Sequence, residues 1–204
     1  MGWNMIRQAY KDSAEFFLKT LTQVPGDAWA SPGLGEWTLQ ELVGHTYRSF
    51  VNLETYAATP GTQVDQNDPV DYFLAVRGGQ ANPATVAQRG REAGQELGEE
   101  PVTRVNAAAQ QAAKVLDGLT DDAILTTLVG GMRLIDYLPS RIFELTVHTL
   151  DVAKAIGVKE EPPSAAMRVT LHLMADLAVA SGVGADLAFA VTGRLSLPPG
   201  YSVL

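Results

Sequence analysis

Apolar side chains recur three and four positions apart through several long segments, and this spacing constrains the fold more than any other feature of the chain. In the first segment, residues 3–22, Ile6, Tyr10 and Leu21 fall on one face of a helix. The same spacing predicts helices over residues 38–57, 102–119, 138–157 and 164–181. Long helices that each bury one face favour a four-helix bundle with additions, so we predict a mainly all-α fold.

Capping residues and glycines set the expected limits of these helices. Thr38 and Glu41 form a capping box at the start of the second helix, and Gly157 is placed as a glycine that ends the fourth. Residues 58–101 are expected to form one long crossover with short extra helices, one of which Gly90 and Gly94 would weaken. A small β-hairpin is predicted near residues 125–135, centred on a pair of glycines.

Composition narrows the classes of function. The 204 residues suit one domain over 1–204, with 183–204 as a short C-terminal extension. A formal charge of −8 without a basic stripe argues against nucleic acid as the main partner. The absence of cysteine excludes disulfides, thiolate ligands and a cysteine nucleophile.

Neither end of the chain suggests a membrane or secreted protein. The N-terminus lacks the apolar run of a secretion signal, and charged residues interrupt the apolar region 165–192, so no membrane span is expected. We therefore expect a cytoplasmic protein and leave its oligomeric state open, a homodimer included.

The stretch RIFELTVHTLD, residues 141–151, carries a polar stripe along one side of the fourth helix. Glu144 and His148 are four residues apart and point into the same space, with Arg141 and Asp151 one turn beyond them on either side. An inward carboxylate requires a partner, which is either Arg141 or a divalent metal ion. Asp151 either hydrogen-bonds the other nitrogen of a metal-bound His148 or is a solvated or capping residue.

His45 on the second helix supplies a third candidate ligand. It shares a helix face with Leu42, Ser49 and Leu53, so it is expected to point toward the interior and meet Glu144 and His148. Three protein ligands with an open position are typical of a reactive metal site, whereas structural zinc sites are closed by four.

The segments LGEWTLQELVGH and YLPSRIFELTVHTLDVAKAIG together resemble the N-terminal metal-binding domain of mycothiol-dependent maleylpyruvate isomerases, within the DinB-like bundle superfamily. By motif, His45, Glu144 and His148 match the metal ligands of that family. The resemblance implies zinc as the usual metal and the small thiol mycothiol as cosubstrate. Isomerases of this family also carry a second, sterol-carrier-like domain, which is not expected in residues 1–204, so maleylpyruvate itself is not the expected substrate.

The leading hypothesis is a metal-dependent, mycothiol-dependent thiol transferase or isomerase acting on a small electrophilic substrate. The alternatives are a non-catalytic metal or thiol sensor, a bundle with a vestigial triad, and a hydrolase that uses a metal-activated hydroxide. Two imidazoles and a carboxylate also suit Ni2+, Fe2+ or Mn2+, so the metal is open.

Several other polar or aromatic residues are given structural roles. His172 has no partner motif and is expected to be structural or at the surface. Trp37 is expected to pack at the start of the second helix, with a pocket-lining role as the alternative. Glu41 and Asn52 neighbour His45 on the helical wheel, and they are expected at the surface, with a place in the pocket as the alternative. We assign no chemistry to Arg194.

Overall fold

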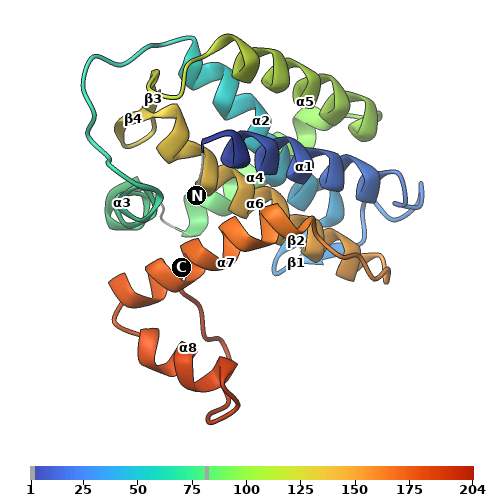
Figure 1. Cartoon of the computed structure of the whole chain (residues 1–204). Coiled ribbons are helices and arrows are strands. Elements are labelled where there is room, and N and C mark those ends of the chain that lie inside the picture. Colours follow the sequence, from blue (N-terminus) through green and yellow to red (C-terminus); the bar gives the residue numbers. More distant parts are fainter. Residues whose placement is uncertain (1–2, 81–82) are drawn as a thin grey trace.

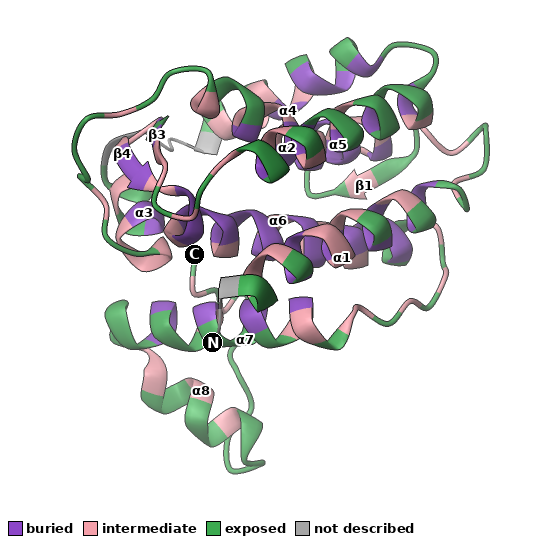
Figure 2. Cartoon of the chain, turned by 45° about the horizontal axis from the view of Figure 1, so that its top comes forward, coloured by how far each residue is buried: buried purple, intermediate pink, exposed green. Residues whose placement is uncertain are grey.

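A computed structural model describes residues 3–80 and 83–204, and it confirms the mainly helical fold (Figure 1). Four long helices form the bundle: α1 (Trp3–Leu21), α2 (Leu39–Ala57), α5 (Pro101–Gly118) and α6 (Leu134–Ala155). Helix α6 packs against both α1 and α2, and it is the most deeply buried of the helices (Figure 2). The helix that carries Glu144 and His148 is therefore held on several sides.

Local chemistry fixes the ends of the helices that matter for the site. The Thr38 hydroxyl accepts from the Glu41 backbone N–H and the Glu41 carboxylate accepts from the Thr38 N–H, which confirms the capping box of α2. Helix α6 begins at Leu134, four residues before the predicted start, because the N–H groups of Leu134 and Ile135 donate to the carbonyls of Ala123 and Asp121. Gly157 follows α6 with φ +72°, as a terminating glycine should.

The long crossover between α2 and α5 is confirmed, and it contains α3 (Pro69–Ala75), a π-helical turn (Val76–Gln80) and α4 (Pro83–Leu97). Helix α4 packs closely along α2. A Cβ atom at Gly44 would clash with the backbone of Gly94, and one at Gly90 would clash with the Trp37 ring. The α4 glycines, which the sequence analysis took as weakening this helix, therefore allow its close approach to α2.

Two small antiparallel hairpins flank the bundle. The predicted one is present as β3 (Ile124–Thr127) and β4 (Gly130–Arg133), but Gly130 and Gly131 lie in the second strand rather than at the centre of the turn. They are needed there because residues 63–65 pack directly on them, with the Gly131 N–H donating to Asp65 Oδ2 at 2.7 Å. The other hairpin, β1 (Pro32–Leu34) and β2 (Trp37–Thr38), was not predicted, since the segment is short and rich in glycine and proline.

The C-terminal fifth of the chain adds α7 (Ser164–Ala180) and α8 (Gly184–Val191). Helix α7 packs on α6 and α1. Helix α8 has no buried residue and lies on the side of α7 that faces away from the bundle (Figures 1 and 2). After α8 the chain turns back, and the Tyr201 hydroxyl donates to the Val183 carbonyl at 3.2 Å. Over the described ranges 3–80 and 83–204, no helix has both the length and the apolar character needed to cross a bilayer.

Candidate metal centre

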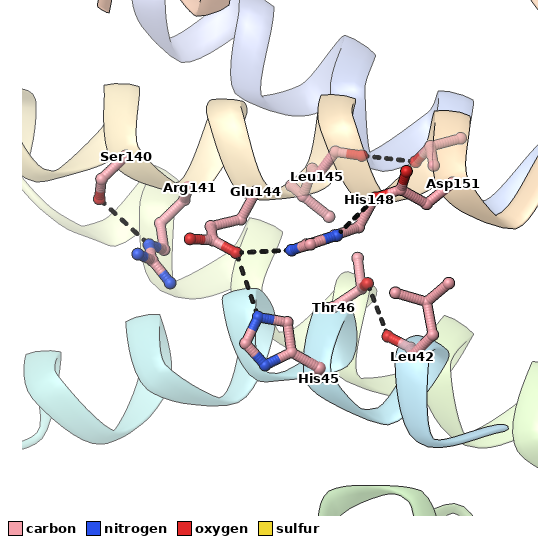
Figure 3. A network of polar contacts seen from close by, with 10 residues as sticks. Leu42, His45, Thr46, Ser140, Arg141, Glu144, Leu145, His148 and Asp151 are labelled. Carbon is pink, nitrogen blue, oxygen red and sulfur yellow. Dashed lines mark hydrogen bonds and ion pairs between the residues drawn. The ribbon is translucent and has the colours of Figure 1, made fainter. Parts of the chain in front are cut away.

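Three side chains from two helices converge on one point. The Nε2 atom of His45, on α2, lies 3.3 Å from Glu144 Oε2, and the Nε2 atom of His148, one turn along α6, lies 3.2 Å from the same oxygen (Figure 3). One ligand atom from each residue lies within 4.8 Å of the other two. The structure thus brings together the three residues that the sequence singled out.

The three side chains line a cavity rather than lying in the closed core. Their exposed fractions are 20% for His45 and 15% for both Glu144 and His148. The cavity has a volume of about 670 Å³ and is bounded by α2, the crossover, α6 and the C-terminal residues. A second molecule would therefore reach a ligand held at this point through the cavity.

The other ring nitrogen of His148 is held by a carboxylate. His148 Nδ1 lies 3.0 Å from Asp151 Oδ2, one turn further along α6 (Figure 3). Burial by itself lowers the pKa of His148, but the hydrogen bonds and negative charges of Asp151 and Glu144 outweigh it and raise the pKa to about 9. Without a metal, His148 is therefore protonated at neutral pH, and its Nε2 proton points at Glu144.

The surroundings lower the pKa of both Glu144 and His45, in contrast to that of His148. Burial raises the pKa of Glu144, yet hydrogen bonds from His148 and His45 hold it well below its ordinary value, so the carboxylate is ionised. Burial lowers the pKa of His45 and Glu144 compensates only in part, so His45 is neutral at pH 7. Its ring lies against Trp37 at a centroid distance of 4.7 Å, and its Nδ1 atom is buried with no hydrogen-bond partner in the described part of the chain.

This donor set fits a divalent ion. Two imidazole nitrogens and a carboxylate oxygen are a ligand set of reactive zinc sites, and the remaining coordination position would face the cavity. Asp151 occupies the place from which carboxylates orient metal-bound imidazoles through the other ring nitrogen.

Arg141, one of the two candidate partners of Glu144, does not form an ion pair with it. Within residues 3–80 and 83–204 its only hydrogen bond runs from Nε to the Ser140 hydroxyl at 3.1 Å, and no ion pair is formed with a carboxylate. Its guanidinium carbon lies instead over two aromatic rings, 5.0 Å from the centroid of Tyr137 and 5.5 Å from that of Tyr72. The charge of Glu144 still acts on the guanidinium without a direct contact: burial lowers the pKa of Arg141, and Glu144 is among the groups that raise it.

Two residues for which a place in the pocket was the less favoured alternative, Trp37 and Asn52, line the cavity. Trp37 packs at the start of α2 as expected, with its Nε1 donating to the Ala87 carbonyl at 3.1 Å, but it also stacks on His45. Asn52, expected at the surface, is half-buried in the cavity wall. Asn52 shares a face of α2 with His45 on a helical wheel, and this spacing is the sequence signal that points to it.

The remaining candidates lie outside the centre. Glu41 is half-buried at the capping box, where it packs against Gly94. His172 is exposed on α7, as expected, and its Nδ1 lies 2.8 Å from the Arg168 carbonyl. Arg194 is exposed after α8.

Comparison of the sequence with protein-family models gives a match. The model of the mycothiol maleylpyruvate isomerase N-terminal domain matches residues 10–153, which include α2, α6 and all three converging side chains. The chain belongs to this family. Searches of the curated proteins and of the solved structures gave no match.

In this member of the mycothiol maleylpyruvate isomerase N-terminal domain family, part of the cavity wall comes from beyond the matched region. Met174 of α7, Leu187 of α8 and the segment 201–204 all line the cavity. Sequence reasoning did not place these residues, since a tail that packs back on a distant helix leaves no periodic signal.

Proposed function

We propose that this protein is a metal-dependent, mycothiol-dependent transferase or isomerase that acts on a small electrophilic substrate. The observation that carries the proposal is the convergence of His45, Glu144 and His148 at the wall of a cavity large enough for a thiol and a second molecule. Membership of the mycothiol maleylpyruvate isomerase N-terminal domain family supports mycothiol as the thiol. The chain has no cysteine, so the sulfur nucleophile must come from a bound molecule.

His45, Glu144 and His148 would hold the ion, and zinc is the first choice for this ligand set, with Ni2+, Fe2+ and Mn2+ as alternatives. A bound divalent ion would lower the pKa of the thiol and supply positive charge beside its sulfur. Asp151 would fix the His148 ring through Nδ1 and keep Nε2 directed at the ion. To bind the ion, His148 must first give up the proton that Asp151 and Glu144 favour.

The cavity walls favour a reaction between bound molecules over one with water. Aromatic and aliphatic side chains predominate around the centre, namely those of Trp37, Tyr56, Tyr72, Phe73, Phe143, Val147 and Met174. Such a lining excludes water and strengthens electrostatic interactions inside the site. The volume of the cavity also favours an enzyme over a sensor, because a sensor that only binds metal or thiol requires no space for a second substrate.

Titration of the cobalt-loaded protein with mycothiol tests the proposal directly. The expected result is a thiolate-to-cobalt charge-transfer band that saturates at one thiol per protein, together with thiol-dependent turnover of a panel of electrophiles. Binding without turnover would support the sensor, and turnover that does not need thiol would support the hydrolase. A protein that holds no ion after metal loading, by elemental analysis, would leave only the vestigial bundle.

A further inference from the structure

The cavity beside the metal centre concentrates positive charge in an acidic protein. The chain has a formal charge of −8, yet the side chains that line this cavity include four arginines and one carboxylate, that of Glu144. These arginines are Arg48 on α2, Arg77 after α3, Arg89 on α4 and Arg141 on α6. Three ligands and a divalent ion do not neutralise this excess, because the ion brings more positive charge than Glu144 removes.

Arg141 is the member of this set with the strongest need for a ligand. Only 6% of the residue is exposed, and its single hydrogen bond uses Nε, so no described residue accepts from its two terminal nitrogens. A buried guanidinium normally has a carboxylate or several carbonyl partners, since desolvation without compensation is costly. The faces of Tyr72 and Tyr137 and the charge of Glu144 supply part of the compensation, but none of them accepts a hydrogen bond from the terminal nitrogens. The donor edge, with its fork of N–H groups, remains available on the cavity side.

Arg48 contributes to the same region from the opposite helix. Arg48 and Arg141 both line the cavity, and burial raises the pKa of Tyr56 while the charges of these two arginines lower it, so both guanidinium groups act on the same part of the wall. Arg48 is half-buried and has no hydrogen bond or ion pair among residues 3–80 and 83–204. Asn52, one turn along α2, adds an amide to this wall.

We propose that Arg141, assisted by Arg48, binds the carboxylate of a ligand whose remaining part is apolar and lies against the aromatic wall of the cavity. A planar carboxylate matches the paired N–H donors of a guanidinium, and Tyr72, Phe73 and Phe143 offer ring faces and edges for the apolar part. That this ligand is the electrophilic substrate rests on the proposed function. The binding itself does not, because Arg141 is not one of the metal-holding residues.

A matched pair of fluorescent ligands tests this subsite: 2-naphthoate, a carboxylate, and 2-naphthalenemethanol, its neutral analogue of similar size. The protein is used in metal-free form first, so that a carboxylate bound to the ion is not counted. We expect the full chain to bind the carboxylate about tenfold or more tightly than the alcohol, as one charge-assisted bidentate contact would give.

Variants locate the preference. Arg141→Met should abolish it and Arg141→Lys should reduce it, because an ammonium group keeps the charge without the fork. Arg48→Gln, in a half-buried residue with no bonds to lose, should weaken it severalfold without unfolding the protein. Arg104→Gln, at an exposed arginine of α5 outside the cavity, is the control and should behave as wild type.

Three results would overturn the inference: equal affinity for acid and alcohol in wild type, a preference that Arg141→Lys and Arg48→Gln both leave unchanged, or a preference that appears only with bound zinc. If Arg141→Met does not fold, the other two variants still decide. Carboxylate binding without any thiol binding would keep this subsite and reject the proposed function, whereas thiol turnover without carboxylate preference would do the reverse.

Discussion

Replacing His45 with alanine tests the metal centre most directly, because His45 is the one ligand contributed by α2. The variant leaves Glu144 Oε2 and His148 Nε2, which lie 3.2 Å apart on one turn of α6 and approach an ion from a single side. Loss of a residue that merely hydrogen-bonds a metal ligand weakens binding about 10- to 100-fold. Loss of a ligand should exceed that, so we expect the zinc dissociation constant to rise more than about 100-fold, or about 2.7 kcal/mol.

The metal-free His45→Ala protein should also be less stable than wild type. The neutral imidazole makes a 3.3 Å hydrogen bond to the ionised Glu144, and loss of such a bond to a charged group costs about 1.5–3 kcal/mol. Urea unfolding of both metal-free proteins measures this difference, and circular dichroism establishes that the variant is folded before its metal affinity is compared.

Competition with a zinc chelator of known affinity, together with elemental analysis of the purified proteins, measures the effect on metal binding. His172→Ala is the matched control, since His172 is exposed on α7 and makes only a contact with a carbonyl of its own helix. If His45→Ala retains one ion per chain with unchanged affinity, or if His172→Ala loses the ion, the three-residue assignment is wrong.

Three further predictions follow from the contacts of α6 and α2. Protonated His148 stabilises the metal-free fold fully below pH 6.5, and this contribution is lost as the pH rises through its raised pKa of about 9. Zinc binding at pH 7 should therefore release a proton from His148. Calorimetry in two buffers of different ionisation enthalpy measures the number of protons released. Asp151→Asn should weaken zinc binding about 10- to 100-fold in a competition assay above pH 9. The effect should be smaller at pH 7, because there the wild type must first lose the His148 proton that Asp151 helps to hold. An equal effect at both pH values would contradict the assigned pKa of His148. Gly44→Ala should lower the free energy of unfolding by about 1–3 kcal/mol, the usual cost of overpacking, because the added Cβ meets the α4 backbone. Gly118→Ala is the control: its Cβ has open space, so it should be neutral or stabilising. Urea unfolding measures both.

The sequence by itself determined the helices and the three residues that meet. Apolar spacing identifies the bundle helices, and the spacing of Glu144 and His148 places them on one side of α6 in any helical structure. The capping box of Thr38 and Glu41 fixes where α2 begins, and hence which face carries His45. These are properties of residues within five positions of one another, so the sequence expresses them without knowledge of the fold.

Only the tertiary structure decided what surrounds those residues. Arg141 was a candidate partner of Glu144 by proximity along the helix, but its position over Tyr72 depends on where the crossover packs. Gly94 reads as a weak point of its own helix until α2 is placed against it. Part of the cavity wall depends on the return of residues 201–204 after α8. Contacts between segments so far apart depend on how whole faces fit together, and side-chain periodicity reports which face is apolar but not which partner covers it.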